Sequence, residues 1–186
     1  MSFLEVLSLV VILLIAVAWY LTYTAARLDR LHTRVESTYA ALDAQLVRRA
    51  EAVLELANSG ALDPAGALIV AGAATDSLEA GDAAQVEREA IESELTHALR
   101  LVTAAGQAGT QSATREQNVD DSVRTEALTR LDDAHQRVTM ARRFHNDAIT
   151  DVLRLRRNLL VRVFRLAGYT DLPRTVEFDD DLPLRR

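Results

Sequence analysis

The sequence predicts an all-α protein in which an N-terminal transmembrane helix continues into a long antiparallel, up-down helical bundle. No charged residue occurs between Glu5 and Arg27, and about 20 apolar residues are enough for a helix to cross the bilayer core. No Gly or Pro occurs before Gly60, so nothing local ends that helix at the membrane surface. Aromatic residues make up only 5% of the chain, while Ala and Leu are abundant, which favours helices over a sheet.

The first predicted element is the membrane anchor, residues 1–26. Trp19, Tyr20 and Tyr23 lie near its C-terminal end, where an aromatic belt meets the membrane–water interface. The residues that we expect to mark the anchor are Val6, Leu13, Trp19, Tyr20 and Tyr23.

Two alternatives compete with an uncleaved anchor. A cleaved signal peptide has a basic n-region and a small-residue cleavage site after a shorter apolar core. Here Glu5 stands in the n-region, which has no Lys or Arg, and Ala16-Val17-Ala18 lies inside the apolar run. The other alternative is a core helix of a soluble protein, but such helices are seldom this long and this apolar. We therefore predict a single-pass anchor in the lipid bilayer.

Charge predicts the orientation and excludes one class of partner. Arg27, Arg30 and Arg34 follow the apolar run and no Lys or Arg precedes it, so the positive-inside rule places the bundle in the cytoplasm at the cell membrane. The absence of cysteine fits a reducing compartment. The formal net charge of −6 argues against a nucleic-acid binder. All 21 basic residues are arginine, which we attribute to codon composition.

The first bundle helix carries an apolar stripe that one arginine interrupts. Arg49 falls on the stripe, whereas Arg48 points away from it. A buried arginine needs an acidic partner or carbonyl groups, and we expect Glu87 or Glu94 to supply the acid. The alternative is that Arg49 extends its charged head to solvent along an apolar stem. The stripe consists of Leu28, Leu31, Val35, Tyr39, Leu42, Leu46, Val53 and Ala57.

Local signals delimit the next helices. Gly60 follows the first helix as a C-terminal cap, and Asp63-Pro64 marks the start of a short, weak helix over residues 64–79. A third helix is predicted over residues 83–105 and a polar loop over 106–119. The inner face of the third helix reads Ala84, Ile91, Leu95, Ala98 and Val102.

The last predicted helix starts after Asp120 or Asp121 and meets no Gly or Pro before Gly168. Arg142 lies on its inner face and is a second candidate for a buried polar residue. The residues from 169 to 186 are acidic and contain proline, and they are expected to be extended. The inner face reads Leu128, Leu131, His135, Val138, Arg142, His145, Ile149 and Val152.

Five arginines gather near the end of this helix without an acidic residue between Asp151 and Asp171. Their positive charges could stabilise the helix by balancing the partial negative charge that the helix dipole places at its C-terminus. If the helices alternate in direction, they could instead contact anionic headgroups or a protein partner. These candidates for a membrane-surface or partner contact are Arg154, Arg156, Arg157, Arg162 and Arg165.

The sequence predicts no catalytic, cofactor-binding or metal site. Glu94 and His97, and likewise Asp132 and His135, have the spacing of di-iron bundles, but one ligand of each pair faces away from its helix's inner stripe. There is no Cys nucleophile, Gly-rich phosphate loop or nucleophile elbow.

The first and last bundle helices carry two segments, Gln45–Glu51 and Ala141–Ala148, that resemble the LemA family of bacterial membrane-anchored helical proteins. Residues 163–169 and 176–178 also fit this family. His145 stands where the family usually has Tyr, and the Pro that often breaks the family's last helix is absent near Arg156. The resemblance implies an anchor and a long antiparallel bundle, without an established activity.

Three functions follow as hypotheses. The first is a LemA-like, non-enzymatic scaffold or interaction module with an unidentified protein partner. The second is a sensory bundle that binds a small ligand between Arg49, His135 and Arg142. The third is a hydrolase or a partner subunit of a membrane-associated hydrolase. The predicted domains are the anchor at 1–26, a LemA-like cytoplasmic bundle at 27–168 and the acidic tail at 169–186.

Overall fold

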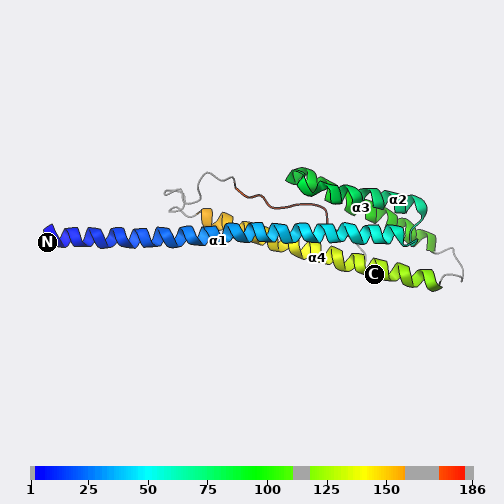
Figure 1. The fold of residues 1–186 in the computed structure, drawn as a ribbon, viewed down its shortest axis with the longest axis horizontal. Helices are drawn as coiled ribbons and strands as arrows, with labels where there is room; N and C mark the ends of the chain where they lie inside the picture. The colour runs from blue at the N-terminus through cyan, green and yellow to red at the C-terminus, as the bar shows by residue number, and fades with distance from the viewer. Residues whose placement is uncertain (1–2, 111–117, 158–171, 183–186) are drawn as a thin grey trace. The chain divides into compact units, whose positions relative to one another are not determined.

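The computed structural model describes residues 3–110, 118–157 and 172–182, and within them every regular element is a helix (Figure 1). The prediction of an all-α chain that begins with a long apolar helix is confirmed for these residues. The elements are α1 (Phe3–Asn58), α2 (Pro64–Glu79), the short 3-10 helix η1 (Ala80–Asp82), α3 (Gln85–Thr110) and α4 (Asn118–Arg156).

The predicted boundaries hold where a strong local signal marks them. Helix α2 has the predicted bounds, and Asp63 caps it by accepting a hydrogen bond from the Gly66 N–H. Gly60 adopts a φ of 75°, the left-handed conformation that suits the residue after a helix.

Other boundaries were predicted wrongly because their signals are weak. Helix α3 extends to Thr110, into the predicted loop, since glycines raise the cost of a helix without forbidding it. Helix α4 begins at Asn118 and ends at Arg156, where neither Gly nor Pro marks an end. The rest of the predicted last helix, from residue 158 onward, lies outside the described residues.

The chain divides into two compact units, and α1 and α4 contribute to both. The first unit comprises Met1–Thr38 and Asn146–Thr175. In it, the Arg34 guanidinium lies 3.4 Å from the Asp151 carboxylate, which joins the two helices. Its buried side chains include Leu28, Ile149 and Val152.

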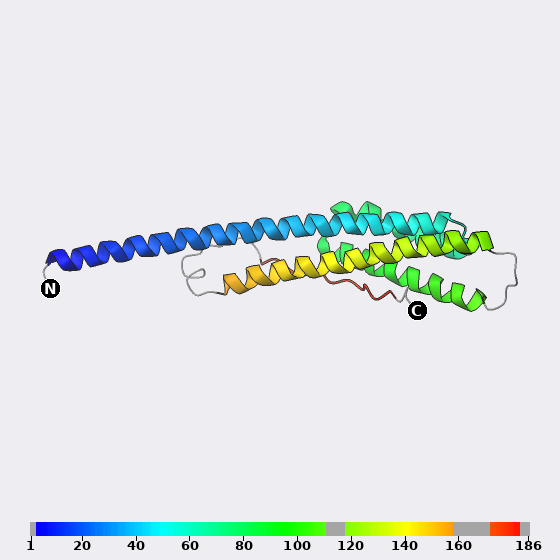
Figure 2. The ribbon, with the colours of Figure 1, turned by 90° about the horizontal axis from the view of Figure 1, so that it is seen from below.

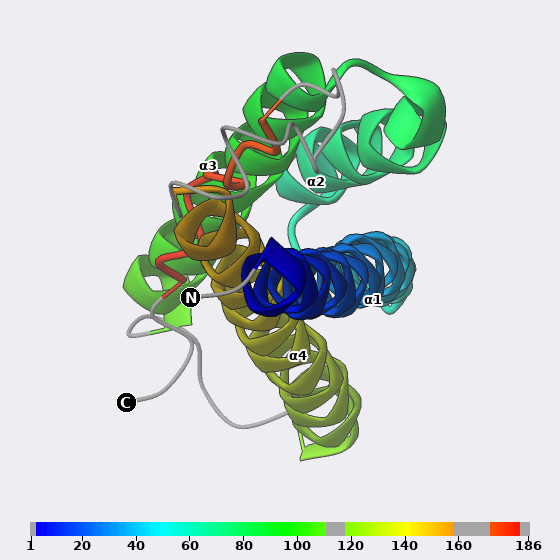
Figure 3. The same ribbon diagram turned by 90° about the vertical axis from the view of Figure 1, so that its left-hand side faces the viewer.

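The second unit comprises Tyr39–His145 and Val176–Arg186, and it holds the core. Figure 3 shows α2 beside α3, and these two helices are in contact. One apolar cluster draws on all four α-helices and on Leu182, and the other joins Leu42, Leu46 and Val138 to Val176 and Phe178. The first cluster includes Ala50, Val53, Leu56, Val70, Ala74, Leu95, Leu99 and Leu131.

Two glycines of α2 differ in what surrounds them. A Cβ at Gly66 would lie 2.7 Å from Asp63 Oδ1 and 3.1 Å from a methyl group of Val102. A Cβ at Gly72 would meet nothing within 4 Å. The space at Gly66 therefore lets the capping residue and α3 approach α2, whereas Gly72 only lowers the helix propensity.

We predict that Gly72→Ala stabilises the protein by about 0.5–1 kcal/mol, the gain from replacing Gly by Ala within a helix. Gly66→Ala should be less stable than Gly72→Ala by about 1 kcal/mol or more, because its methyl group displaces the capping carboxylate. Denaturant unfolding followed by circular dichroism measures both. Equal gains at the two sites would show that Gly66 is not needed for packing.

Candidate functional site

The centre of the second unit is a buried ion pair between α1 and α3. The Arg49 and Glu92 side chains are both 0% exposed. One terminal nitrogen of Arg49 donates to Glu92 Oε2 and, at 3.3 Å, to the Glu92 main-chain oxygen. The other donates to Thr96 Oγ1 at 3.4 Å.

Glu92 is also the partner of a second arginine. Its Oε1 accepts a hydrogen bond from Ser77 Oγ at 2.8 Å and lies 3.0 Å from Arg88 Nε, in ion-pair contact without hydrogen-bond geometry. Arg88 in turn reaches Asp43 of α1 at 3.2 Å. One buried carboxylate therefore connects α1, α2 and α3.

Burial and pairing act in opposite directions on Arg49. Burial lowers its pKa, while the charge of Glu92 and its hydrogen bond raise it. Arginine is effectively never deprotonated in proteins, so Arg49 stays charged and depends on Glu92 for its neutralisation.

The partner of Arg49 corrects one prediction. Glu87 and Glu94, the expected partners, are exposed on α3, and Glu92 takes their place. The predicted inner face used only apolar residues, whereas the buried face runs through polar ones as well. Arg88 and Glu92 precede Leu95, Leu99 and Val102 at alternating steps of four and three residues, which is the signal that could have identified them.

The second part of the site is the C-terminal segment 176–182, whose packing against the helices was not predicted from the sequence. Residues 176–182 have no regular secondary structure, yet Val176, Phe178 and Leu182 are buried. The ring of Phe178 lies 5.7 Å from the Arg49 guanidinium carbon and 5.3 Å from that of Arg142. Both distances fit cation–π contacts. The alternation of apolar and charged residues at Val176, Glu177 and Phe178 was the sequence signal that could have indicated this packing.

Polar contacts hold this segment on α3 and α4, beside which it runs in red in Figures 2 and 3. On α4, Arg142 pairs with Asp180 at 2.8 Å, and His135 Nε2 donates to the Asp180 carbonyl at 2.9 Å. On α3, Arg100 pairs with Asp179 and donates to the Asp181 carbonyl at 2.6 Å.

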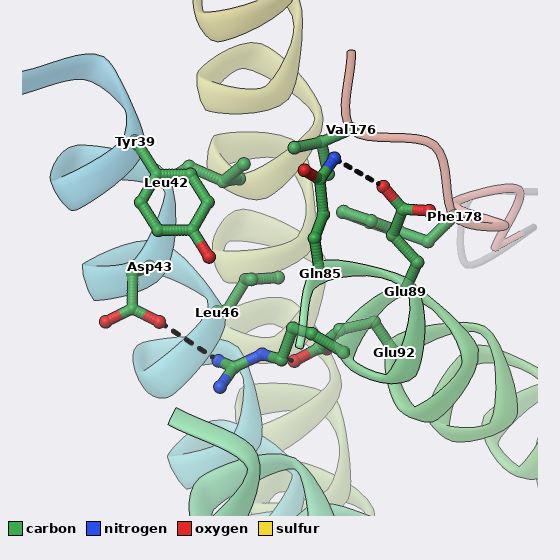
Figure 4. Close-up of a pocket in the computed structure, with 10 residues that line it drawn as sticks. Tyr39, Leu42, Asp43, Leu46, Gln85, Glu89, Glu92, Val176 and Phe178 are labelled. Atoms are coloured by element: carbon green, nitrogen blue, oxygen red, sulfur yellow. Dashed lines mark hydrogen bonds and ion pairs between the residues drawn. The ribbon is translucent and has the colours of Figure 1, made fainter. Parts of the chain in front are cut away.

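The space beside Phe178 is small. Figure 4 shows Val176 and Phe178 facing side chains of α1 and α3 across a cavity of about 10 Å³, which is room for about one water molecule. A ligand between Arg49 and Arg142, as the sensory hypothesis requires, would compete with Phe178 for this position.

A wider surface groove of about 760 Å³ lies along α2 and α3. Leu68, Ile69 and Leu101 are exposed there, and Glu94 and His97 belong to its lining. Among the described residues, no group of three His, Cys, Asp or Glu side chains gathers in metal-binding geometry.

The other predicted site residues are divided between the two units, with Arg142 in the second and those of the anchor and of the end of α4 in the first. The five anchor residues Val6, Leu13, Trp19, Tyr20 and Tyr23 are all exposed on α1. Arg142 is half-buried, so it is more accessible than Arg49. Arg154 is exposed and Arg156 half-buried on α4, Arg157 is exposed directly after it, and Arg162 and Arg165 lie outside the described residues.

Comparison of the chain with known protein families, curated proteins and solved structures finds no match. The LemA resemblance therefore rests on the sequence motifs alone.

We predict that Arg49→Ala costs about 3 kcal/mol or more of folding stability, because it breaks a buried ion pair. Glu92→Gln should cost at least as much, since it leaves two guanidinium groups without their shared carboxylate. The matched control is the exposed neighbour Arg48, whose change to Ala should cost less than about 0.5 kcal/mol. Urea unfolding monitored by circular dichroism compares the three, and similar losses for Arg48→Ala and Arg49→Ala would contradict the assignment.

His135 predicts a dependence of stability on pH. Burial and the nearby Arg49 charge lower the pKa of His135, against smaller opposing effects of Asp180 and Asp132. Below about pH 6.5 the unfolded chain binds this proton more readily than the folded one. The stabilisation is therefore complete above that pH and declines as pH falls toward the depressed pKa.

Unfolding free energies at pH 7.5 and 5.5 should differ less in His135→Gln than in the wild type. His97→Gln, which removes an exposed histidine of α3, should keep the wild-type difference. An unchanged pH dependence in His135→Gln would refute this role.

Proposed function

We propose that this chain is a membrane-anchored helical-bundle protein of the LemA type, serving as a non-enzymatic scaffold or interaction module at the cytoplasmic face of the cell membrane. The observation that carries the proposal is the composition of α1. Its most apolar 18-residue window has a mean hydropathy of 2.5 and is 0% buried, whereas residues 42–56 of the same helix line the core of the bundle.

The exposure of this window supports an anchor over a core helix. A core helix buries its apolar side chains against the rest of the protein, but residues 3–20 are all exposed. Burying apolar surface away from water yields about 25 cal/mol per Å², so lipid stabilises such a helix far better than water. Trp19 and Tyr23 stack with their ring centroids 6.2 Å apart, which suits an interfacial aromatic belt.

The family assignment and the antiparallel, up-down order of the helices are part of the proposal. They are supported by the Gln45–Glu51 and Ala141–Ala148 segments. In the structure His145, which replaces the usual Tyr of the family, is buried with its ring 5.5 Å from that of Tyr39. The cytoplasmic orientation is supported by Arg27, Arg30 and Arg34 after the apolar run.

A non-enzymatic role is supported by the pairing of the buried and half-buried arginines with carboxylates. Arg49, Arg88 and Arg142 are engaged by carboxylates of the same unit. Such pairing stabilises a particular arrangement of helices and leaves these groups little freedom for acid–base chemistry. The arginines near the end of α4 are proposed as a contact to the membrane surface or a protein partner, and the exposure of Arg154 and Arg157 supports this.

We predict that the full-length protein fractionates with membranes and resists carbonate extraction, with its N-terminus intact. Replacing Leu9, Leu13 and Val17 by Arg should release it, because each charge at the bilayer centre costs about 2.5–3.5 kcal/mol. The matched control changes the exposed bundle residues Ala44, Ala90 and Thr129 to Arg and should stay in the membrane fraction.

The orientation is read from reporters fused after Arg186. A reporter that works in the cytoplasm should be active, and a phosphatase that requires export should not. Mature protein that begins after Ala18 or Ala26 would indicate a cleaved signal peptide instead. An active phosphatase fusion would overturn the orientation while leaving the anchor intact.

A further inference from the structure

Residues 176–182 are held in the manner of a bound peptide. They contact a set of side chains of α1, α3 and α4 that we call the tail groove. Every second side chain of residues 176–178 turns inward, since Val176 and Phe178 are buried while Glu177 is exposed. The tail groove consists of Arg49, Glu89, Ser93, Arg100, His135 and Arg142.

The contacts to the main chain of this segment do not depend on its sequence. The N–H groups of residues 177 and 179 donate to Glu89 Oε1 and Ser93 Oγ, each at 3.1 Å. Glu89 and Ser93 are one i,i+4 step apart, or about 6 Å along the helix axis. Two residues of extended chain span about 6.7 Å, so any extended peptide could make the same pair of hydrogen bonds.

The side-chain contacts, in contrast, define a class of ligand. An aromatic ring contacts the guanidinium groups of both Arg49 and Arg142. The next two positions carry carboxylates, of which Asp179 meets Arg100 and Asp180 meets Arg142. The tail groove therefore selects an apolar residue, then any residue, then an aromatic residue followed by two acids.

The native segment is not held tightly everywhere. The Arg100 and Asp179 side chains are 31% and 43% exposed, and ion pairs so exposed contribute little and weaken with salt. A short segment without regular secondary structure can open locally without unfolding of the helices, even though Val176, Phe178 and Leu182 are buried.

Opening would uncover a basic and apolar surface on an acidic protein. Arg49 and Arg142 would lose the ring that covers them, and Leu42, Leu46 and Val138 would lose Val176 and Phe178. Because the whole chain has a net charge of −6, this concentration of arginine is a local feature. We propose that the tail groove binds an extended acidic peptide of a partner protein, and that residues 176–182 are its intramolecular competitor.

This proposal rests on the interaction-module function and gives that module a surface and a class of partner. It is tested with the full-length protein in detergent micelles and a fluorescent peptide of the sequence Arg-Thr-Val-Glu-Phe-Asp-Asp-Asp-Leu, the chain's own residues 174–182. The double variant Phe178→Ala, Asp180→Asn weakens the native segment. It should bind the peptide at least about tenfold more tightly than the wild type does, because the tethered competitor is weakened.

Matched variants identify the site. Adding Arg142→Gln to the double variant should abolish peptide binding, whereas adding Arg137→Gln, an exposed arginine of α4, should not. A peptide with Ala in place of its Phe should not bind, and raising the salt should release the normal peptide. The proposal would be overturned if the double variant bound the normal peptide and the Ala-substituted peptide equally. It would also be overturned if neither the wild type nor the double variant bound the normal peptide. A dimer of the double variant that exchanges segments with a second copy would also overturn it, since the occupant would then be the chain itself.

Hydrogen exchange on the wild type gives a test that does not rely on a variant's folding. The amides of Glu177 and Asp179 should exchange faster than helical amides of α3, and excess unlabelled peptide should accelerate them further by displacing the segment. If these amides exchange only with global unfolding, the segment is a fixed part of the fold and the proposal fails. Both readouts are made in detergent, so membrane fractionation can succeed or fail independently of them.

Discussion

The second unit depends on how the charge of Arg49 is neutralised. An uncompensated guanidinium in an apolar core costs several kcal/mol, so the position is tolerable only with Glu92 opposite it. Because Glu92 also engages Ser77 and Arg88, a shift of one helix by a single turn would break several contacts at once. Apolar residues could fill the same volume, but they would tolerate more than one register. The ion pair thus favours one alignment of α1, α2 and α3.

The same charge also explains why an aromatic residue stands at position 178. The face of the Phe178 ring is electronegative, and it can cover the guanidinium groups of Arg49 and Arg142 while excluding water from the adjacent apolar cluster. An aliphatic residue would fill the space without this attraction. The buried pair and the C-terminal segment are therefore energetically linked, although they are far apart in the sequence.

Much of the fold could be predicted from local signals. The absence of Gly and Pro before Gly60 predicts the long α1, and Asp63-Pro64 predicts the start of α2. The periodicity of α1 placed Arg49 on the inner stripe and Arg48 outside it, and their exposure agrees with that placement. The partner of Arg49 could not be found in the same way. A stripe defined by apolar residues alone leaves out Glu92, because the sequence does not distinguish a buried acid from a surface acid until its partner is known. The packing of residues 176–182 escaped prediction because three acids in a row indicate a solvated tail, unless arginines on other helices neutralise them.

The chain has arginine but no lysine, and the buried positions show where that choice has physical consequences. At Arg49 the planar group contacts Glu92 twice, reaches Thr96 and presents its face to Phe178. A lysine ammonium is a compact point charge that lacks this face, and burial readily neutralises it. At exposed positions such as Arg48, lysine would supply the same charge to solvent. Codon composition can therefore account for the surface arginines, whereas at position 49 the geometry of the site itself requires the guanidinium.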